Sequence, residues 1–212
     1  MLNISILDLG VNNLNSAKRA FSEHLLQTDF IRFSANAEEV SKDCNLIILP
    51  GLGSFESGMN ALYERNFVDF IREGNDKKLK ILGICLGMQL LFRSSDESPD
   101  QAGLGLLEGH VSKLPKQTTE RIPNVGWNSV NYRGNASEFK SLQGSSDFYF
   151  VHSYASLDLD KNFALSTTSF GTDVFVSSIK TANLLAFQFH PEKSGKIGRK
   201  LIAEIIEWAR ED

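Results

Sequence analysis

Hydrophobic positions in the first 95 residues follow two alternating patterns. Short apolar runs predict four strands, at residues 2–8, 30–33, 45–49 and 80–84. Stretches with apolar residues every three or four positions predict helices, at residues 12–26 and 57–73, with a brief helical turn at 38–42. Residues 46–49 are all apolar, so we expect that strand to be buried on both faces. Strands that alternate with helices predict a parallel sheet with helices on both sides.

After residue 92 the pattern changes. A polar loop is expected at 93–100, and short strand-like segments follow at residues 105–113, 128–132, 148–154, 163–169, 173–180 and 184–189. Short strands separated by turns are typical of antiparallel pairing, so we expect an antiparallel extension of the sheet. The apolar positions of residues 198–210 predict a final amphipathic helix.

Composition adds little to this picture. With 42% hydrophobic and 23% charged residues, the chain resembles an ordinary globular protein. The net charge of −4 gives no reason to expect nucleic-acid binding. Two cysteines are too few for a disulfide framework, and no run of about 18 apolar residues predicts a membrane span. We expect a cytoplasmic protein with a single domain over residues 1–212.

Candidate chemistry begins where the strand at 80–84 ends. Residues 83–87 read Gly-Ile-Cys-Leu-Gly and lead into helix-favouring residues, which is the pattern of a nucleophile elbow with cysteine in place of serine. At such a turn Cys85 starts a helix, where free N–H groups favour the reactive thiolate and the N–H of Leu86 can bind an oxyanion. The competing interpretation is that Cys85 is a small buried apolar residue.

A second candidate group ends the strand at 184–189. His190 is followed two residues later by Glu192, so both side chains can lie on one side of an extended x-Pro-x segment. Glu192 can then hold one imidazole nitrogen and leave the other for Cys85, which is the arrangement of a catalytic triad. The distance between Cys85 and His190 does not follow from the sequence.

These two motifs resemble the signature pair of the class I, triad-type glutamine amidotransferases. The likeness extends over nearly the whole chain, and more narrowly the chain resembles the glutaminase-subunit family of imidazole glycerol phosphate synthases. Further matching segments lie at residues 50–55, 123–128, 149–154 and 189–195. The resemblance implies a flavodoxin-like α/β fold of the class I amidotransferases, with a mostly parallel central sheet, flanking helices and an antiparallel extension.

The same resemblance implies a mechanism without a metal or an organic cofactor. Cys85 attacks the side-chain amide of glutamine, His190 moves the proton to ammonia, and Glu192 orients His190. The N–H groups of Leu86 and Leu52 form the oxyanion hole.

The substrate-binding positions implied by the resemblance lie in four segments. Their residues are Gly51, Gly53, Gln89, Glu97, Ser153 and Tyr154. Glu97 suits the α-amino group of glutamine, and the backbone around Ser153 and Tyr154 suits its α-carboxylate. We interpret His152 as structural, because His190 already has an orienting partner. Cys44 is expected to be an inert thiol.

The implied partner is a cyclase subunit with a (βα)₈-barrel fold, which receives the ammonia within a heterodimer. Asn13, Asn124 and Trp127 are expected near this partner. The chain departs from the usual family pattern at residues 8–14 and 123–128, both near the partner or the ammonia path. These departures leave a second pathway open, the amidination of a nucleotide-sugar for surface polysaccharides. A non-catalytic scaffold and a thiol hydrolase of other substrates are the remaining alternatives.

Overall fold

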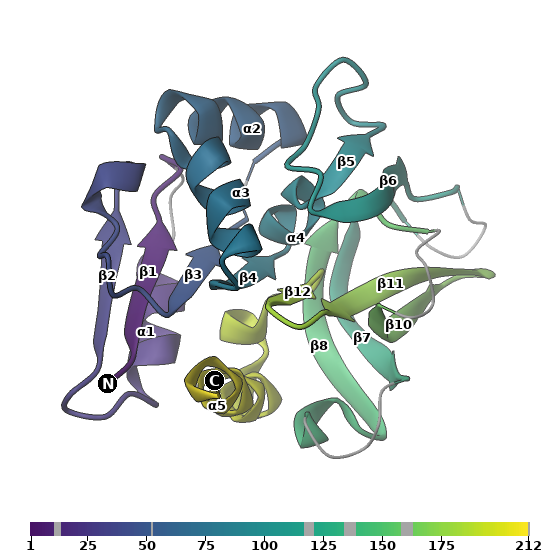
Figure 1. Ribbon diagram of the computed structural model, residues 1–212. Coiled ribbons are helices and arrows are strands. Elements are labelled where there is room, and N and C mark those ends of the chain that lie inside the picture. The colour runs from purple at the N-terminus through teal and green to yellow at the C-terminus, as the bar shows by residue number, and fades with distance from the viewer. Residues whose placement is uncertain (11–13, 52, 117–120, 134–138, 158–162, 212) are drawn as a thin grey trace.

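The computed structural model describes residues 1–10, 14–51, 53–116, 121–133, 139–157 and 163–211 (Figure 1). Its main sheet has the strand order β2-β1-β3-β4-β12-β11-β10-β7-β8 within this part of the chain. The bounds are β1 Asn3–Leu7, β2 Phe30–Ser34, β3 Leu46–Leu49, β4 Lys80–Ile84, β7 Asn124–Tyr132, β8 Ser145–His152, β10 Ala164–Phe170, β11 Asp173–Lys180 and β12 Leu184–Phe187.

The sheet has a parallel half and an antiparallel half. Strands β2, β1, β3, β4 and β12 pair in parallel, in the order found in flavodoxin-like folds. The pairs β12–β11, β11–β10, β10–β7 and β7–β8 are antiparallel. Both halves confirm the predicted fold class. All residues of β3 are buried, because helices cover both faces of the sheet there.

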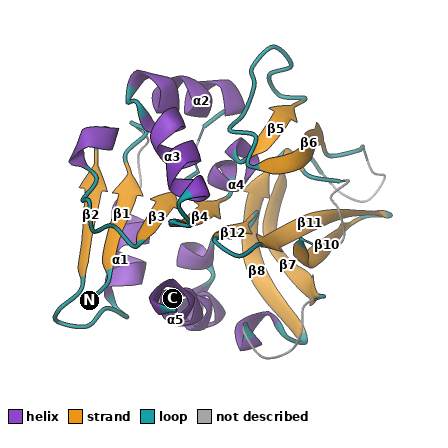
Figure 2. Ribbon diagram, viewed as in Figure 1, coloured by secondary structure: helices purple, strands orange, loops and turns teal. Residues whose placement is uncertain are grey.

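The helices divide between the two faces of the sheet, as Figure 2 shows in purple. On one face, α1 Leu14–Ser22 and α5 Gly195–Arg210 pack on a core that includes Phe21 and Ile205. On the other face, α2 Phe55–Glu64, α3 Phe67–Asp76 and α4 Leu86–Leu90 pack on a core that includes Met59 and Ile71. The short 3₁₀ turns are η1 Ala37–Glu39, η2 Lys140–Leu142 and η3 Pro191–Lys193. No helix in the described ranges is both long enough and apolar enough to cross a membrane.

The helix expected at 57–73 is two helices. The chain breaks at Arg65 and Asn66, and Asn66 adopts a left-handed backbone with φ of 58°. Asparagine tolerates this conformation better than most residues. The carbonyl of Arg65 accepts a hydrogen bond from Ala37 N at 3.1 Å, so the break is tied to η1. Apolar spacing continues across the break and therefore did not reveal it.

The predicted polar loop at 93–100 also needs correction. It contains β5 Phe92–Ser95, which pairs in parallel with β6 Leu107–Lys113, and β6 pairs in turn with β9 Tyr154–Ala155. Ser95 is fully buried in this small sheet despite its polar side chain. The pairing with β6 therefore decides the conformation of a segment whose own sequence favours a loop.

Candidate active site

Cys85 lies at a strained turn between β4 and α4. Its φ of 52° and ψ of −107° are unusual for a residue other than glycine, and its N–H donates to the carbonyl of Phe187 at 2.7 Å. A side chain at Gly87 would place Cβ 1.9 Å from the carbonyl oxygen of Leu49. At Gly51 it would lie 2.2 Å from the backbone nitrogen of Leu86. Glycine at these two positions lets Leu49 and Gly51 approach the backbone of the turn directly.

His190 reaches the cysteine from the neighbouring strand. Phe187 of β12 is in register with Ile84 of β4, so the segments that follow these two strands leave the sheet at the same edge. Nδ1 of His190 lies 2.8 Å from Oε1 of Glu192, and the two side chains are only 2% and 7% exposed. The predicted charged pair is thus buried beside the elbow.

The charge of His190 is set by its two neighbours. Burial alone lowers the pKa of His190, but hydrogen bonding and charge interactions with Cys85 and Glu192 outweigh it and raise this pKa to about 10. Nε2 of the same ring is buried and makes no hydrogen bond to an oxygen or nitrogen atom of the described residues. His190 is therefore an imidazolium at neutral pH, and it places a positive charge beside the sulfur of Cys85.

A cavity of about 290 Å³ opens onto the sulfur. It is lined by Gly51, Gly53, Cys85, Leu86, Gln89, Glu97, Pro123, Val151, His152, Ser153 and Tyr154. All the substrate-binding residues predicted from the sequence are in this set. His190 and Glu192 do not line this cavity. Leu52 and Asn13 lie outside the described residues.

Glu97 has a structural contact as well as a place in the cavity. Its Oε2 accepts a hydrogen bond from Phe55 N, the first residue of α2, at 2.7 Å. Ser54 caps the same helix through a reciprocal pair with Ser57. Glu97 thus joins the loop after β5 to the start of α2.

Two glutamines contact each other beside the cysteine. Nε2 of Gln89 donates to the carbonyl of Tyr154 at 2.8 Å and to Oε1 of Gln188 at 3.0 Å. Nε2 of Gln188 in turn lies 3.7 Å from the sulfur of Cys85. Sequence reasoning did not single out Gln188. The available signal was a polar residue directly after the apolar strand 184–187, at a position that proves fully buried.

Burial keeps His152 neutral, and a chain of hydrogen bonds fixes the orientation of its ring. Its Nδ1 donates to the carbonyl of Tyr154 at 2.9 Å, and its Nε2 accepts from Nδ2 of Asn124 at 3.1 Å. Oδ1 of Asn124 accepts from Asn128 at 3.0 Å, which fixes the orientation of the Asn124 amide. Burial lowers the pKa of His152 to about 4, and the charge of His190 acts in the same direction.

These bonds correct the expectation for Asn124. Its side chain is 7% exposed and points into the chain toward His152, rather than to a partner-facing surface. Trp127, on the same strand, is 55% exposed, and Val125 beside it is 56% exposed. The alternation of β7 therefore separates an inward asparagine from an outward apolar pair.

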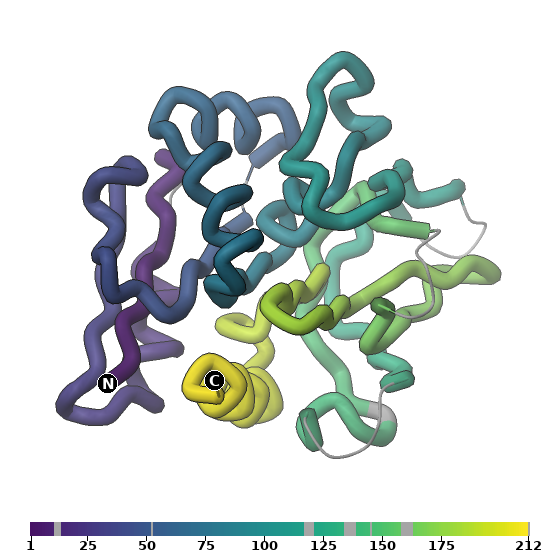
Figure 3. The backbone as a smooth tube through the Cα atoms, viewed as in Figure 1, coloured from purple at the N-terminus to yellow at the C-terminus, as the bar shows by residue number. Residues whose placement is uncertain are grey.

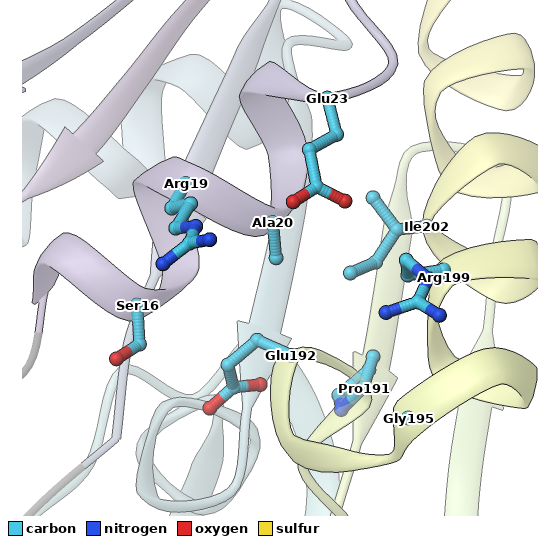
Figure 4. A pocket seen from close by; sticks show the side chains of 9 residues that line it. All are labelled: Ser16, Arg19, Ala20, Glu23, Pro191, Glu192, Gly195, Arg199 and Ile202. Carbon is cyan, nitrogen blue, oxygen red and sulfur yellow. The ribbon is translucent and has the colours of Figure 1, made fainter.

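A second cavity, of about 300 Å³, is lined in part by Glu192 (Figure 4). Helix α1 contributes Arg19 to its wall, the turn after α1 contributes Glu23, and α5 contributes Arg199. Oε2 of Glu192 is buried and has no hydrogen-bond partner among the described residues. Glu192 thus lines this cavity and also contacts His190.

Fold and site together define a triad-type amidotransferase, and comparison with known proteins agrees. The family model "Glutamine amidotransferase class-I" matches residues 5–207, and the chain belongs to this family. Solved structures with the same fold include a "Crystal structure of glutamine amidotransferase" with a TM-score of 0.74, at 19% identity over 97% of this chain and 98% of that one. PurLQS from Thermotoga maritima matches with a TM-score of 0.72, at 17% identity over 98% of both chains.

Within the family, the chain is similar to proteins named imidazole glycerol phosphate synthase subunit HisH. One such protein from Prochlorococcus marinus is 37% identical, over 100% of this chain and 97% of the relative. The protein from Thermotoga maritima is 36% identical, over 97% of this chain and 97% of the relative. The protein from Aquifex aeolicus is 39% identical, over 93% of this chain and 92% of the relative. The chain is thus a glutamine amidotransferase that matches these subunits over nearly their full length.

Proposed function

We propose that this chain is the cytoplasmic glutaminase subunit of a heterodimer that serves histidine biosynthesis. Ammonia from glutamine passes to a (βα)₈-barrel cyclase subunit, which makes imidazole glycerol phosphate and an aminoimidazole carboxamide ribotide. The observation that carries the proposal is the buried Glu192–His190 pair beside Cys85, in a chain with end-to-end similarity to HisH subunits.

The mechanism starts from a thiolate and an imidazolium. The sulfur of Cys85 attacks the side-chain carbonyl carbon of glutamine, and a C–S bond forms while the carbonyl oxygen becomes an oxyanion. His190 gives its proton to the amide nitrogen, the C–N bond breaks, and ammonia leaves. Neutral His190 then takes a proton from water while the water oxygen attacks the thioester carbon, and the C–S bond breaks. Glutamate is released, and thiolate and imidazolium are restored.

Glutamine occupies the 290 Å³ cavity in this proposal. Glu97 binds its α-amino group through the carboxylate oxygen that does not cap α2, and the backbone at Ser153 and Tyr154 binds its α-carboxylate. Because both amide hydrogens of Gln89 are directed at protein acceptors, Gln89 acts toward substrate through Oε1.

The oxyanion hole is formed by the N–H of Leu86 and an N–H of the loop at 50–53, for which we propose Leu52. The close packing of Gly51 on Leu86 supports this arrangement, since it brings the loop backbone against the first turn of α4.

The partner is proposed to dock over the outward face of β7, at Trp127. The large exposed area of Trp127 and Val125 supports this, because aromatic and apolar side chains are enriched at interface cores. Asn13 is proposed near the same partner. No acceptor-binding site is proposed in this chain, so ammonia must leave it to be used.

The test measures glutamate release by the purified chain with its cyclase subunit, with each candidate acceptor in turn. We expect turnover to depend on the formimino-carboxamide ribotide ligand, and Cys85→Ala to lower it at least about a thousandfold. Cys44→Ala is the matched control, because Cys44 lies away from the cavity and burial raises the pKa of its thiol.

Two results would contradict this proposal. Full glutamine-dependent activity in Cys85→Ala would exclude Cys85 as the nucleophile. Stimulation by a nucleotide-sugar acceptor, with none by the ribotide, would assign the chain to sugar amidination.

A further inference from the structure

The side chain of Gln188 contacts the reactive sulfur from inside the protein. Gln188 directly follows β12, is fully buried, and has its backbone N–H bonded to Ser177 O at 2.9 Å. Cys85 directly follows β4, and the last residues of these two parallel strands are in register. The sheet therefore places Gln188 and Cys85 side by side, with Nε2 3.7 Å from Sγ.

A backbone carbonyl determines whether the oxygen or the NH₂ group of the Gln188 side chain faces the sulfur of Cys85. The carbonyl of Tyr154 can only accept a hydrogen bond, so Gln89 must turn its NH₂ group toward it. The same NH₂ group then donates to Gln188, which must present its Oε1. The NH₂ group of Gln188 is left facing Cys85, and an inverted amide would break this chain of bonds.

The sulfur also has a hydrogen-bond acceptor as a neighbour, in contrast to the donor of Gln188. The carbonyl of Val151 lies 3.8 Å from Sγ and can accept a hydrogen from a thiol, but it offers nothing to a thiolate. Among the described residues, the titratable groups around the site are His190 and Glu192 after β12, His152 on β8, Tyr154 on β9 and Glu97 after β5. His190 is the positively charged group among them. Gln188 adds an uncharged hydrogen-bond donor to the sulfur.

We propose that Gln188 is a positioning residue for the nucleophile: its amide, oriented by Gln89, donates a hydrogen bond to the Cys85 sulfur and favours thiolate over thiol. This rests on the proposed role of Cys85 as nucleophile. Removing the donor leaves His190 as the main support of the negative charge. The reactive form of Cys85 then persists over a narrower range of pH.

The experiment measures alkylation of Cys85 by iodoacetamide as a function of pH, in a Cys44→Ser background without glutamine. In Gln188→Met, which keeps the length of the side chain and removes the donor, the pH of half-maximal rate should rise by about one unit. One unit corresponds to a roughly tenfold loss of thiolate on the acidic side of the curve. Gln101→Met, the same change in a loop away from the site, should leave the curve in place.

Gln89→Met tests the orientation of the amide. This variant leaves Gln188 in place but frees its amide to rotate, so the pH of half-maximal alkylation should rise by less than in Gln188→Met. In the double variant, that pH should be no higher than in Gln188→Met alone. A folded Gln188→Met variant with an unchanged curve would overturn the proposal. If that variant does not fold, the Gln89→Met curve decides: a rise supports the proposal and an unchanged curve overturns it.

The readout separates this inference from the proposed function. Alkylation needs no glutamine turnover and no partner subunit. A wild-type chain that fails to hydrolyse glutamine would refute the proposed function and leave the alkylation curves as a test of Gln188. If the wild-type chain hydrolysed glutamine normally and the variants had the same alkylation curve as the wild type, only the role of Gln188 would be refuted.

Discussion

At the scale of single residues, two buried histidines near Cys85 have different charges. His190 bonds to a carboxylate and stays protonated, whereas His152 lies between an amide donor and a carbonyl and stays neutral. Burial disfavours the charged form of both side chains. Only His190 has negatively charged neighbours that reverse this effect. Of the two histidines, only His190 thus carries a positive charge and a proton that it can donate.

We predict that NMR of the ring nitrogens separates the two histidines at pH 7. His190 should titrate near pH 10 and His152 near pH 4. Since the folded pKa of His190 exceeds the unfolded value of about 6.5, its charge stabilises the fold fully below pH 6.5 and less as pH rises toward 10. For His152 the folded pKa is depressed, so stability falls as pH is lowered from 6.5 to 4.

Variants assign and test these signals. His190→Gln and His152→Gln should each remove one signal, and Cys85→Ala should lower the titration midpoint of His190, because the sulfur contributes to the raised pKa. A midpoint for His190 near 6.5 in the wild type would contradict the ion pair on which the mechanism depends.

At the scale of elements, the small sheet holds the loop that carries Glu97. Oγ of Ser94 on β5 lies 2.8 Å from Nδ1 of His110 on β6, and Nε2 of His110 lies 2.7 Å from Oδ1 of Asp96. Oδ2 of Asp96 accepts from Lys113 N at 3.0 Å. Hydrogen bonding to His110 is the main cause that lowers the pKa of Asp96. This network fixes the residue immediately before Glu97.

Glu97 is predicted to have two separable roles. Glu97→Ala loses the bond to Phe55 N and should destabilise the chain by about 1 kcal/mol in urea unfolding. Glu97→Gln keeps an oxygen acceptor and should stay within about 0.5 kcal/mol of the wild type. Both lose the charge for the α-amino group, so both should raise KM for glutamine about tenfold or more.

Glu108→Gln is the control, because the Arg93–Glu108 pair is exposed and lies outside the cavity. It should change neither stability nor KM. If Glu97→Gln had the KM of the wild type, Glu97 would be a helix cap only, and its proposed contact with glutamine would be wrong.

At the scale of the whole molecule, the C-terminal helix returns to the beginning of the chain. Figure 3 shows α5 in yellow next to the purple N-terminal segments. Arg210 at its end forms an ion pair with Asp29, which also accepts bonds from Leu2 N and Leu26 N at 2.8 Å each. Burial acts to raise the pKa of Asp29, but Arg210 and these N–H groups outweigh it and lower the pKa to about 2.

Asp29→Asn should therefore lower the free energy of unfolding at neutral pH by about 1–3 kcal/mol. The folded pKa of Asp29 is depressed, so its contribution is present above the unfolded value of about 3.8 and is lost as pH falls toward 2. The difference between the urea midpoints of wild type and variant should be constant from about pH 7 to about pH 5, begin to shrink below about pH 4, and become smallest near about pH 2.

The matched control is Glu73→Gln, since the Lys77–Glu73 pair is 74% and 69% exposed. Exposed ion pairs contribute little to stability, so the free energy of unfolding of Glu73→Gln should differ from that of the wild type by less than about 0.5 kcal/mol at every pH. If the loss of unfolding free energy in Asp29→Asn did not change with pH, it would come from altered packing or hydrogen bonding and not from the lost charge.

The amino-acid sequence by itself determined the class of fold and the candidate chemistry. Apolar runs and helical spacing are local patterns, so the parallel half and the antiparallel half were predictable. The glycines around Cys85 and the short spacing of His190 and Glu192 are also local, and they were enough to name these three residues as candidates.

Only the tertiary structure decided which distant residues meet. The register of β4 with β12 places Gln188 against the sulfur, and the pairing of β7 with β8 turns Asn124 inward to His152. The break at Asn66 and the pairing of β5 with β6 likewise depend on contacts with segments elsewhere in the chain. A polar side chain gives the same local signal whether it faces water or a buried partner, and only strand register and packing distinguish the two.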